Sequence, residues 1–99
     1  MYRNKTIAVI IPAYNEEKLI GKVLKTIPAF IDHIVVVDDA SRDRTGEVVK
    51  AHLKEDPRII YIHHTKNEGV GGAIVTGYKW ARDKLVQKAN KINWVHKTL

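Results

Sequence analysis

Three short apolar runs alternate with segments of helical periodicity along the chain. The runs cover residues 6–11 (TIAVII), 34–37 (IVVV) and 58–62 (RIIYI). Each run is rich in Ile and Val and nearly continuous, as is typical of strands that are buried on both faces of a sheet. The pattern therefore predicts three strands inside one sheet.

Each run is followed by a stretch in which apolar residues recur every three or four positions. The first helix is predicted over residues 16–27, with Asn15 as its N-cap. The second begins near Asp43, and the third runs from about Gly71 to at least Leu85. The inward-facing stripes of the three helices are Leu19, Ile20, Val23, Leu24 and Ile27; Val48, Val49 and Leu53; and Ile74, Gly77, Ala81 and Leu85.

The order of these elements is β-α-β-α-β-α, which predicts an α/β protein of three layers, α/β/α, with a parallel sheet and right-handed crossovers. Ligands bind such sheets at the carboxyl ends of the strands. The turn-rich polar segments of this chain all follow predicted strands: residues 12–17 (PAYNEE), 38–43 (DDASRD) and 63–72 (HHTKNEGVGG). We therefore expect these segments to form one binding site at the carboxyl edge of the sheet.

The composition limits the class of protein. A chain of 99 residues with 44% hydrophobic and 28% charged residues fits one soluble globular domain. The absence of Cys excludes disulfide and thiol chemistry and fits a reducing compartment. No apolar run approaches the length of a membrane-spanning helix, and the first residues do not resemble a signal peptide. We expect a cytoplasmic protein.

The net charge of +6 leaves two interpretations open. It indicates either an anionic partner, such as a nucleotide or an acidic membrane surface, or a solvated basic surface without a specific partner. The Lys and Arg residues are spread along the chain and form no dense block interleaved with aromatic residues. We therefore expect no nucleic-acid binding.

Two common nucleotide-binding motifs do not fit the glycine-rich segment. A dinucleotide fingerprint belongs after the first strand, where residues 12–17 contain no Gly, and the later series would need its third Gly where Ile74 stands. A phosphate loop is matched in spacing by residues 72–77, but Tyr78 stands where that motif needs Lys.

The segments IIPAYNEE, VVVDDASRDRT and NEGVGGAIVTGY, in this order and at these intervals, resemble the N-terminal half of inverting family 2 glycosyltransferases. The resemblance covers residues 6–84 and is closest to the dolichol-phosphate mannose and glucose synthases. It implies an incomplete, Rossmann-like GT-A fold and an enzyme family that transfers a sugar from a UDP- or GDP-sugar to an acceptor. A lipid-phosphate acceptor would bring such a protein to the cytoplasmic face of a membrane as a peripheral protein.

The resemblance also assigns roles to individual residues. The nucleotide-binding residues that it implies are Pro12, Ala13, Tyr14, Glu16, Asp38, Asp39, Asn67 and Gly69. Asp39 would accept a hydrogen bond from the ring N–H of the base, a task that suits an acceptor-only carboxylate. Asp38 would hold its loop, and Ser41 and Asp43 would cap the second helix.

Structural interpretations of the same residues stay open. Asp38 and Asp39 fit an Asx turn followed by a helix cap, and Tyr14 fits packing against a helix. The glycines fit turn geometry and close helix packing. His63 and His64 invite a metal interpretation, but neighbouring residues at a strand end point to opposite faces and cannot easily share one ion.

The resemblance places the catalytic chemistry of the family outside these motifs. An Asp-x-Asp motif that holds Mg²⁺ or Mn²⁺ would follow a fourth strand, yet the chain has no acidic residue after Asp83. We therefore divide the chain into a nucleotide-sugar-binding half of a GT-A domain, residues 1–85, and a non-matching tail, residues 86–99. No catalytic residue, metal ligand or cofactor is assigned, and we expect a truncated transferase that is inactive alone. The alternatives are a non-enzymatic nucleotide-binding module and an inactive remnant.

A missing fourth strand would leave residues 6–11 as an open hydrophobic edge. Two repairs are open: residues 92–96 (INWVH) fold back as a surrogate strand, or two chains pair edge to edge. Of the two, we expect a homo-oligomer formed through the open edge.

Overall fold

The computed structural model describes residues 5–85 and 92–96. It contains a four-stranded parallel sheet in the order β3-β2-β1-β4. In chain order the elements are β1 (Thr6–Ala13), α1 (Ile20–Lys25), β2 (His33–Asp38), α2 (Thr45–Leu53), β3 (Ile59–His63), α3 (Gly69–Leu85) and β4 (Ile92–His96).

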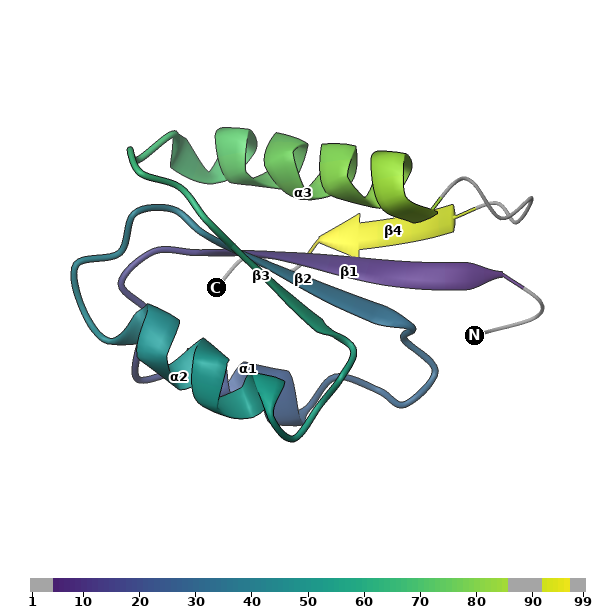
Figure 1. The fold of residues 1–99 in the computed structure, drawn as a ribbon, viewed down its shortest axis with the longest axis horizontal. Coiled ribbons are helices and arrows are strands. Elements are labelled where there is room, and N and C mark those ends of the chain that lie inside the picture. The colour runs from purple at the N-terminus through teal and green to yellow at the C-terminus, as the bar shows by residue number, and fades with distance from the viewer. Residues whose placement is uncertain (1–4, 86–91, 97–99) are drawn as a thin grey trace.

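The sheet lies between two layers of helices. Helix α3 covers one face, and α1 and α2 cover the other (Figure 1). The expected three-layer α/β architecture and the alternation of strands and helices up to α3 are therefore confirmed. In the described part of the chain, no helix is long and apolar enough to cross a membrane.

Strand alternation divides the core between the two faces of the sheet. On the face under α3, Ile10, Val35 and Val37 pack with Ala73 and the partly buried Trp80. Because both faces are covered, β1 and β2 need apolar residues at nearly every position, which explains their continuous Ile and Val runs. The larger cluster, against α1 and α2, consists of Val9, Ile11, Ala13, Ile20, Leu24, Ile31, Ile34, Val36, Val49 and Ile59.

Strand β4 occupies the edge of β1 that the sequence analysis expected to be open. It pairs in parallel with β1, from Thr6 opposite Ile92 to Ile10 opposite His96. The prediction of an open β1 edge is therefore wrong, and the alternative of a surrogate strand at residues 92–96 is confirmed. The physical reason is that a buried edge of unpaired backbone groups is costly, and pairing within the chain satisfies them. Self-association stays a prediction, but the edge of β1 no longer supports it. The division of the chain at residue 85 also stays a prediction.

Helix α1 is shorter than the periodicity predicts. It begins at Ile20, after a turn in which the Ile20 N–H donates to the Glu16 carbonyl oxygen at 2.9 Å. The prediction that Asn15 caps this helix is wrong. Asn15 has a left-handed backbone, with φ 52°, and its side-chain oxygen accepts the Arg42 N–H of another loop at 2.9 Å. Asn tolerates this conformation better than most residues, and a bond to a distant segment replaced the local cap.

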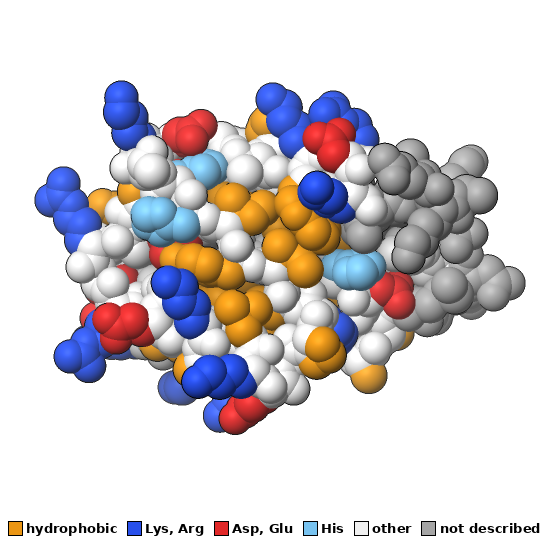
Figure 2. All heavy atoms as spheres, in the orientation of Figure 1, with side chains coloured by type: hydrophobic (Ala, Val, Ile, Leu, Met, Phe, Trp, Pro, Cys, Tyr) orange, Lys and Arg blue, Asp and Glu red, His pale blue; other side chains and the backbone are white. Residues whose placement is uncertain are grey.

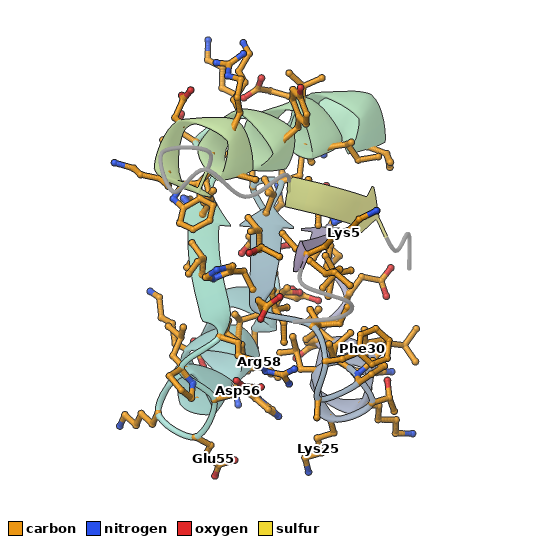
Figure 3. The ribbon with its side chains drawn as sticks, turned by 90° about the vertical axis from the view of Figure 1, so that its right-hand side faces the viewer. Lys5, Lys25, Phe30, Glu55, Asp56 and Arg58 are labelled. Atoms are coloured by element: carbon orange, nitrogen blue, oxygen red, sulfur yellow. The ribbon has the colours of Figure 1, made fainter. Side chains whose placement is uncertain are left out.

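One arginine holds the loops at the amino edge of the sheet. Arg58 pairs with Asp56 at 2.8 Å and donates to the carbonyl oxygens of Pro28 at 2.7 Å and Ile31 at 3.1 Å. Figure 3 shows Asp56 and Arg58 at this end of the molecule. These contacts join the α1–β2 and α2–β3 connections on the side away from the three polar loops.

Candidate functional site

The carboxyl ends of β1, β2 and β3 lie together at one edge of the sheet, on the left in Figure 1. The loops that follow these strands meet at this edge. A pocket of about 230 Å³ opens there and is lined by Pro12, Ala13, Tyr14, Glu16, Asp39, Val70 and Ala73. The predicted convergence of three loops is therefore confirmed.

The first two loops bind each other through side chains. The Asn15 N–H donates to the Ser41 hydroxyl oxygen at 2.9 Å, and the Asn15 side-chain oxygen accepts the Arg42 N–H. The Glu16 N–H donates to the Thr45 hydroxyl oxygen at 2.8 Å. These bonds fix one wall of the pocket, because Glu16 belongs to the lining.

Asp39 is the buried charged residue of the pocket, with a side chain that is 5% exposed. Its Oδ1 atom accepts the Glu68 N–H at 2.8 Å and lies 2.9 Å from Nδ1 of His64. Its Oδ2 atom accepts the Gly69 N–H at 2.8 Å. Three donors from the end of β3 and the start of α3 therefore fix the carboxylate.

The same contacts set the charge of Asp39. Burial alone would raise the pKa of this carboxyl, but the hydrogen bonds from the Glu68 N–H, His64 and the Gly69 N–H outweigh burial and hold the pKa below its ordinary value. Asp39 is therefore ionised at neutral pH. Because an ionised carboxylate only accepts hydrogen bonds, Nδ1 of His64 carries the proton between the two side chains.

His64 is a part of the site that the sequence analysis considered only as a metal ligand. The residue is 7% exposed, and its Nε2 atom lies 2.8 Å from the Thr76 hydroxyl oxygen of α3. It thus links Asp39 at the end of β2 to α3. The neighbouring His63 is exposed, as strand alternation requires. Alternation could have placed one of the two histidines beside the carboxylates, but it could not tell which one.

Asp38 faces away from this pocket. Its Oδ1 atom accepts the Ser41 N–H at 3.0 Å, and its Oδ2 atom accepts the Tyr61 hydroxyl at 2.5 Å. Burial and the bond to Asp38 raise the pKa of Tyr61, so the hydroxyl keeps its proton and keeps donating. Asp38 holds its loop as expected. Its inclusion among the nucleotide-binding residues is not supported by its place, because consecutive strand residues point to opposite faces.

The second loop leads into the first turn of α2. The Asp43 carboxylate accepts the Thr45 N–H at 2.9 Å and so performs the predicted capping, although Arg44 occupies the N-cap position. The prediction that Ser41 caps α2 is wrong, because its hydroxyl serves the first loop instead. Ala40 has a left-handed backbone, with φ 62°, which costs roughly 1–2 kcal/mol for a residue with a Cβ atom. The loop is therefore held in a strained conformation by its bonds.

The pocket contains most of the residues that the resemblance implied. Those that line it are Pro12, Ala13, Tyr14, Glu16 and Asp39. Gly69 lies beside it: its N–H contacts Asp39, and Asn67 accepts the same N–H at 3.0 Å. The φ of 80° at Gly69 explains why Gly stands there. Val70 was missed because α3 begins two residues earlier than the sequence predicts. Ala73 lies within the predicted helix but outside its predicted inward stripe.

The described residues do not fit a metal ion. Within residues 5–84, no three His, Asp or Glu side chains come together in a group that could hold one. The adjacent carboxylates of Asp38 and Asp39 bind different partners on different faces of the sheet. No step of a reaction is therefore assigned to a metal ion in this part of the chain.

Basic residues are dispersed over the face that Figure 2 shows. Hydrophobic side chains gather across its middle, and Lys and Arg side chains surround them without merging into one patch. Strand β3, with the partly buried Ile60, Tyr61 and Ile62, forms the edge of the sheet. The described residues on this face form no dense basic surface of the kind that a nucleic-acid backbone needs.

Comparison with known families agrees with this geometry. The model of the family described as "Glycosyl transferase family 2" matches residues 8–87, a range that contains every residue of the pocket lining. The chain belongs to glycosyltransferase family 2. The resemblance of the three motifs is therefore confirmed, and the sheet is a part of the GT-A fold of this family.

Relatives in family 2 match along most of this chain. The chain is 40% identical over 91 residues to the UDP-N-acetylglucosamine–dolichyl-phosphate N-acetylglucosaminyltransferase of Methanococcus voltae. This match covers 79% of this chain and 36% of the relative. It is 37% identical over 82 residues to the undecaprenyl-phosphate mannosyltransferase of Micrococcus luteus. This second match covers 79% of this chain and 33% of the relative. The chain thus spans about a third of the length of these curated relatives.

A solved structure of a mannosyltransferase from Pyrobaculum calidifontis, in complex with GDP-mannose and Mn²⁺, is similar to this fold. The TM-score is 0.74 at 29% sequence identity, over 81% of this chain and 25% of that chain. That protein binds a nucleotide sugar together with a metal ion.

Proposed function

We propose that the pocket binds the nucleoside diphosphate of a nucleotide sugar and that the chain is the donor-binding part of a family 2 glycosyltransferase. The observation that carries this proposal is Asp39, a buried and ionised carboxylate in a pocket that also has apolar walls. Burying a charge is costly unless partners or a ligand stabilise it. A nucleobase has flat apolar faces and an N–H at its edge, and such a pocket accommodates both.

The start of α3 supports a place for the diphosphate. Val70 and Ala73 of its first turns line the pocket, and the helix is 17 residues long. The first N–H groups of a helix have no acceptor within it, and the helix dipole favours an anion at this end. A Cβ atom at Gly71 would meet no other atom within 4 Å, so this turn leaves space for a ligand. We place the base at Asp39 and the diphosphate toward this turn.

The reaction that we propose for this donor site is transfer of the sugar to a lipid phosphate. The names of the relatives from M. voltae and M. luteus contain dolichyl phosphate and undecaprenyl phosphate. The net charge of +6 suits a protein that works at the anionic cytoplasmic face of a membrane. The described residues bind and orient the donor. We expect turnover only together with the metal-binding and acceptor-binding parts of a family 2 enzyme.

Calorimetric titration of the 99-residue chain with UDP and with GDP, each with and without Mn²⁺, tests the donor site. We expect binding that does not require the metal. Asp39→Asn keeps the size of the side chain but replaces a charged acceptor by an amide whose NH₂ group faces existing donors. It should weaken binding by about tenfold or more, since hydrogen bonds to charged groups contribute about 1.5–3 kcal/mol.

The matched control is Asp83→Asn, because Asp83 is an exposed residue of α3 that pairs with Arg82 outside the pocket. This variant should bind as the unchanged chain does. Circular dichroism establishes that both variants are folded. A folded, unchanged chain that binds neither nucleotide would contradict the proposed function.

A further inference from the structure

We infer that the pocket selects uracil over guanine, so that the donor is a UDP-sugar. This inference rests on the proposed function and concerns the nucleobase that Asp39 binds. The relatives leave the base open, since one name contains UDP-N-acetylglucosamine and the similar solved structure contains GDP-mannose. The number of acceptor positions that the chain itself leaves free on Asp39 carries the inference.

Most acceptor positions of Asp39 are already occupied. An ionised carboxylate offers about four lone-pair positions, two on each oxygen. Both positions of Oδ1 are taken, by the Glu68 N–H at 2.8 Å and by Nδ1 of His64 at 2.9 Å. One position of Oδ2 is taken by the Gly69 N–H at 2.8 Å. Asp39 therefore has one acceptor position left, on Oδ2, for a ligand.

The two bases differ in how many donors they bring to such an acceptor. The pairing edge of uracil carries one N–H between two carbonyl oxygens. The pairing edge of guanine carries two neighbouring donors, the ring N–H and the exocyclic amino group. A carboxylate with two free oxygens would accept both donors side by side. In this pocket Oδ1 is saturated, so guanine would leave its amino group without this partner.

Most of the remaining pocket wall offers no side-chain acceptor for the amino group. The side chains of Pro12, Ala13, Val70 and Ala73 carry no acceptor, and the Ala13 carbonyl oxygen already receives the Asp39 N–H at 2.8 Å. The side-chain acceptors that remain in the lining are the Glu16 carboxylate and the Tyr14 hydroxyl, and Tyr14 is 44% exposed. A donor that loses its water and finds no acceptor weakens binding by about tenfold or more.

His64 is a positioning residue for this selection. Its Nδ1 atom occupies Oδ1 of Asp39, while the Thr76 hydroxyl oxygen lies 2.8 Å from its other nitrogen and fixes the ring. The His64 side chain is 8% exposed and so has little contact with solvent. Without this ring, Oδ1 regains a free acceptor position and the carboxylate gains freedom to turn. The preference for one donor over two should then shrink.

A set of four diphosphates tests the inference by titration of the 99-residue chain. UDP should bind about tenfold or more tightly than GDP. IDP has the ring size of GDP but lacks the amino group, so it should bind more tightly than GDP. N3-methyl-UDP lacks the single imide N–H and should bind about tenfold or more weakly than UDP. The IDP comparison separates the number of donors from the size of the base.

The histidine variants supply the second readout. His64→Leu should reduce the ratio of UDP affinity to GDP affinity, and His63→Leu, on the neighbouring exposed residue, should leave the ratio unchanged. A purely structural role of His64 would lower both affinities and keep their ratio.

The outcomes separate the inference from the proposed function. GDP binding as tight as UDP binding, or tighter than IDP binding, would overturn the inference and leave the donor site standing. If Glu16→Leu then abolished that GDP binding, Glu16 would be identified as the acceptor for the amino group. Binding of none of the four diphosphates would overturn the proposed function and the inference with it.

Discussion

Asp38 and Asp39 stand side by side at the end of β2, and their carboxylates serve opposite faces of the sheet. Asp38 binds the Tyr61 hydroxyl and the Ser41 N–H, whereas Asp39 binds groups of the β3–α3 connection and lines the pocket. The alternation of strand residues separates the two like charges and gives each its own donors. One carboxylate is therefore structural, and the other is available to a ligand.

Removing the Tyr61 hydroxyl should separate stability from binding. In Tyr61→Phe, the 2% exposed Asp38 loses a donor at 2.5 Å. The free energy of unfolding should fall by about 1–3 kcal/mol, the usual cost of an unsatisfied buried group. UDP affinity, measured on the folded variant, should stay unchanged because Asp38 does not line the pocket. A loss of affinity as large as that of Asp39→Asn would show that the two carboxylates are not independent.

The charge of Asp39 should appear in the acid stability of the chain. Its pKa is lower in the folded chain than in the unfolded chain, because the hydrogen bonds outweigh burial. The stabilisation is therefore complete above the unfolded pKa of about 3.9 and is lost as the pH falls through the folded pKa. Urea unfolding between pH 6 and pH 2 should show a steeper loss of stability in the unchanged chain than in Asp39→Asn. Identical slopes would mean that folding does not lower the pKa of Asp39.

Residue roles were predictable where the backbone alone determines them. The place of Asp39 and of the loop from Pro12 to Glu16 follows from their position after parallel strands. The partners of Asn15 and His64 were not predictable, since each binds a residue of a distant segment: Arg42 for Asn15, and Asp39 for His64. Local sequence rules capture caps and turns within a few residues, and they do not reach contacts made by tertiary packing.

At the scale of elements, α3 and β1 approach each other closely at Gly77. A Cβ atom built there would lie 2.5 Å from Cγ2 of Ile10, a fully buried residue of β1. Gly77→Ala should therefore lower the free energy of unfolding by about 1–3 kcal/mol through overpacking. Gly71→Ala is the matched control, because its Cβ atom would meet nothing within 4 Å.

The control substitution on α3 should have the opposite sign. Ala is favoured over Gly in a helix by about 0.8–1.0 kcal/mol, so Gly71→Ala should raise the midpoint of urea unfolding while Gly77→Ala lowers it. Equal changes in the two variants would mean that helix propensity, and not contact with Ile10, dominates at both positions.

The elements themselves were predictable to different degrees. The three apolar runs became β1, β2 and β3 with shifts of at most a few residues, because burial on both faces leaves an unmistakable apolar pattern. Helix α1 was predicted from residue 16 and begins at Ile20, since the bonds of Asn15 and Glu16 to the second loop hold the chain outside the helix. Strand β4 remained only an alternative, because its pairing with β1 joins distant parts of the chain.

At the scale of the whole molecule, the two ends of the sheet have separate tasks. The carboxyl edge carries the pocket, and the amino edge is held by Arg58 and its contacts with Asp56, Pro28 and Ile31. The core between them is built from β1 and β2, which are buried on both faces. Substitutions at the amino edge should therefore change the free energy of unfolding and have little effect on the affinity for the ligand.

Strand β4 should determine the association state of the chain. A chain shortened to residues 1–91 lacks the partner of β1, and the apolar edge from Thr6 to Ile10 would be exposed. Sedimentation velocity at increasing concentrations should show association of the shortened chain beyond that of the full chain. If the shortened chain stayed monomeric at every concentration, the edge of β1 would not drive association.

The pairing of β1 with β4 also has a consequence for synthesis on the ribosome. Strand β1 is made first, while its neighbour β4 follows roughly eighty residues later, which takes on the order of ten seconds at about 5–20 residues per second. During this interval β2 can pair with one side of β1, but the other side has no partner from its own chain. A nascent chain of this protein therefore leaves this edge of β1 unpaired until β4 has been made, so a chaperone that binds extended apolar segments has β1 as a substrate during this interval.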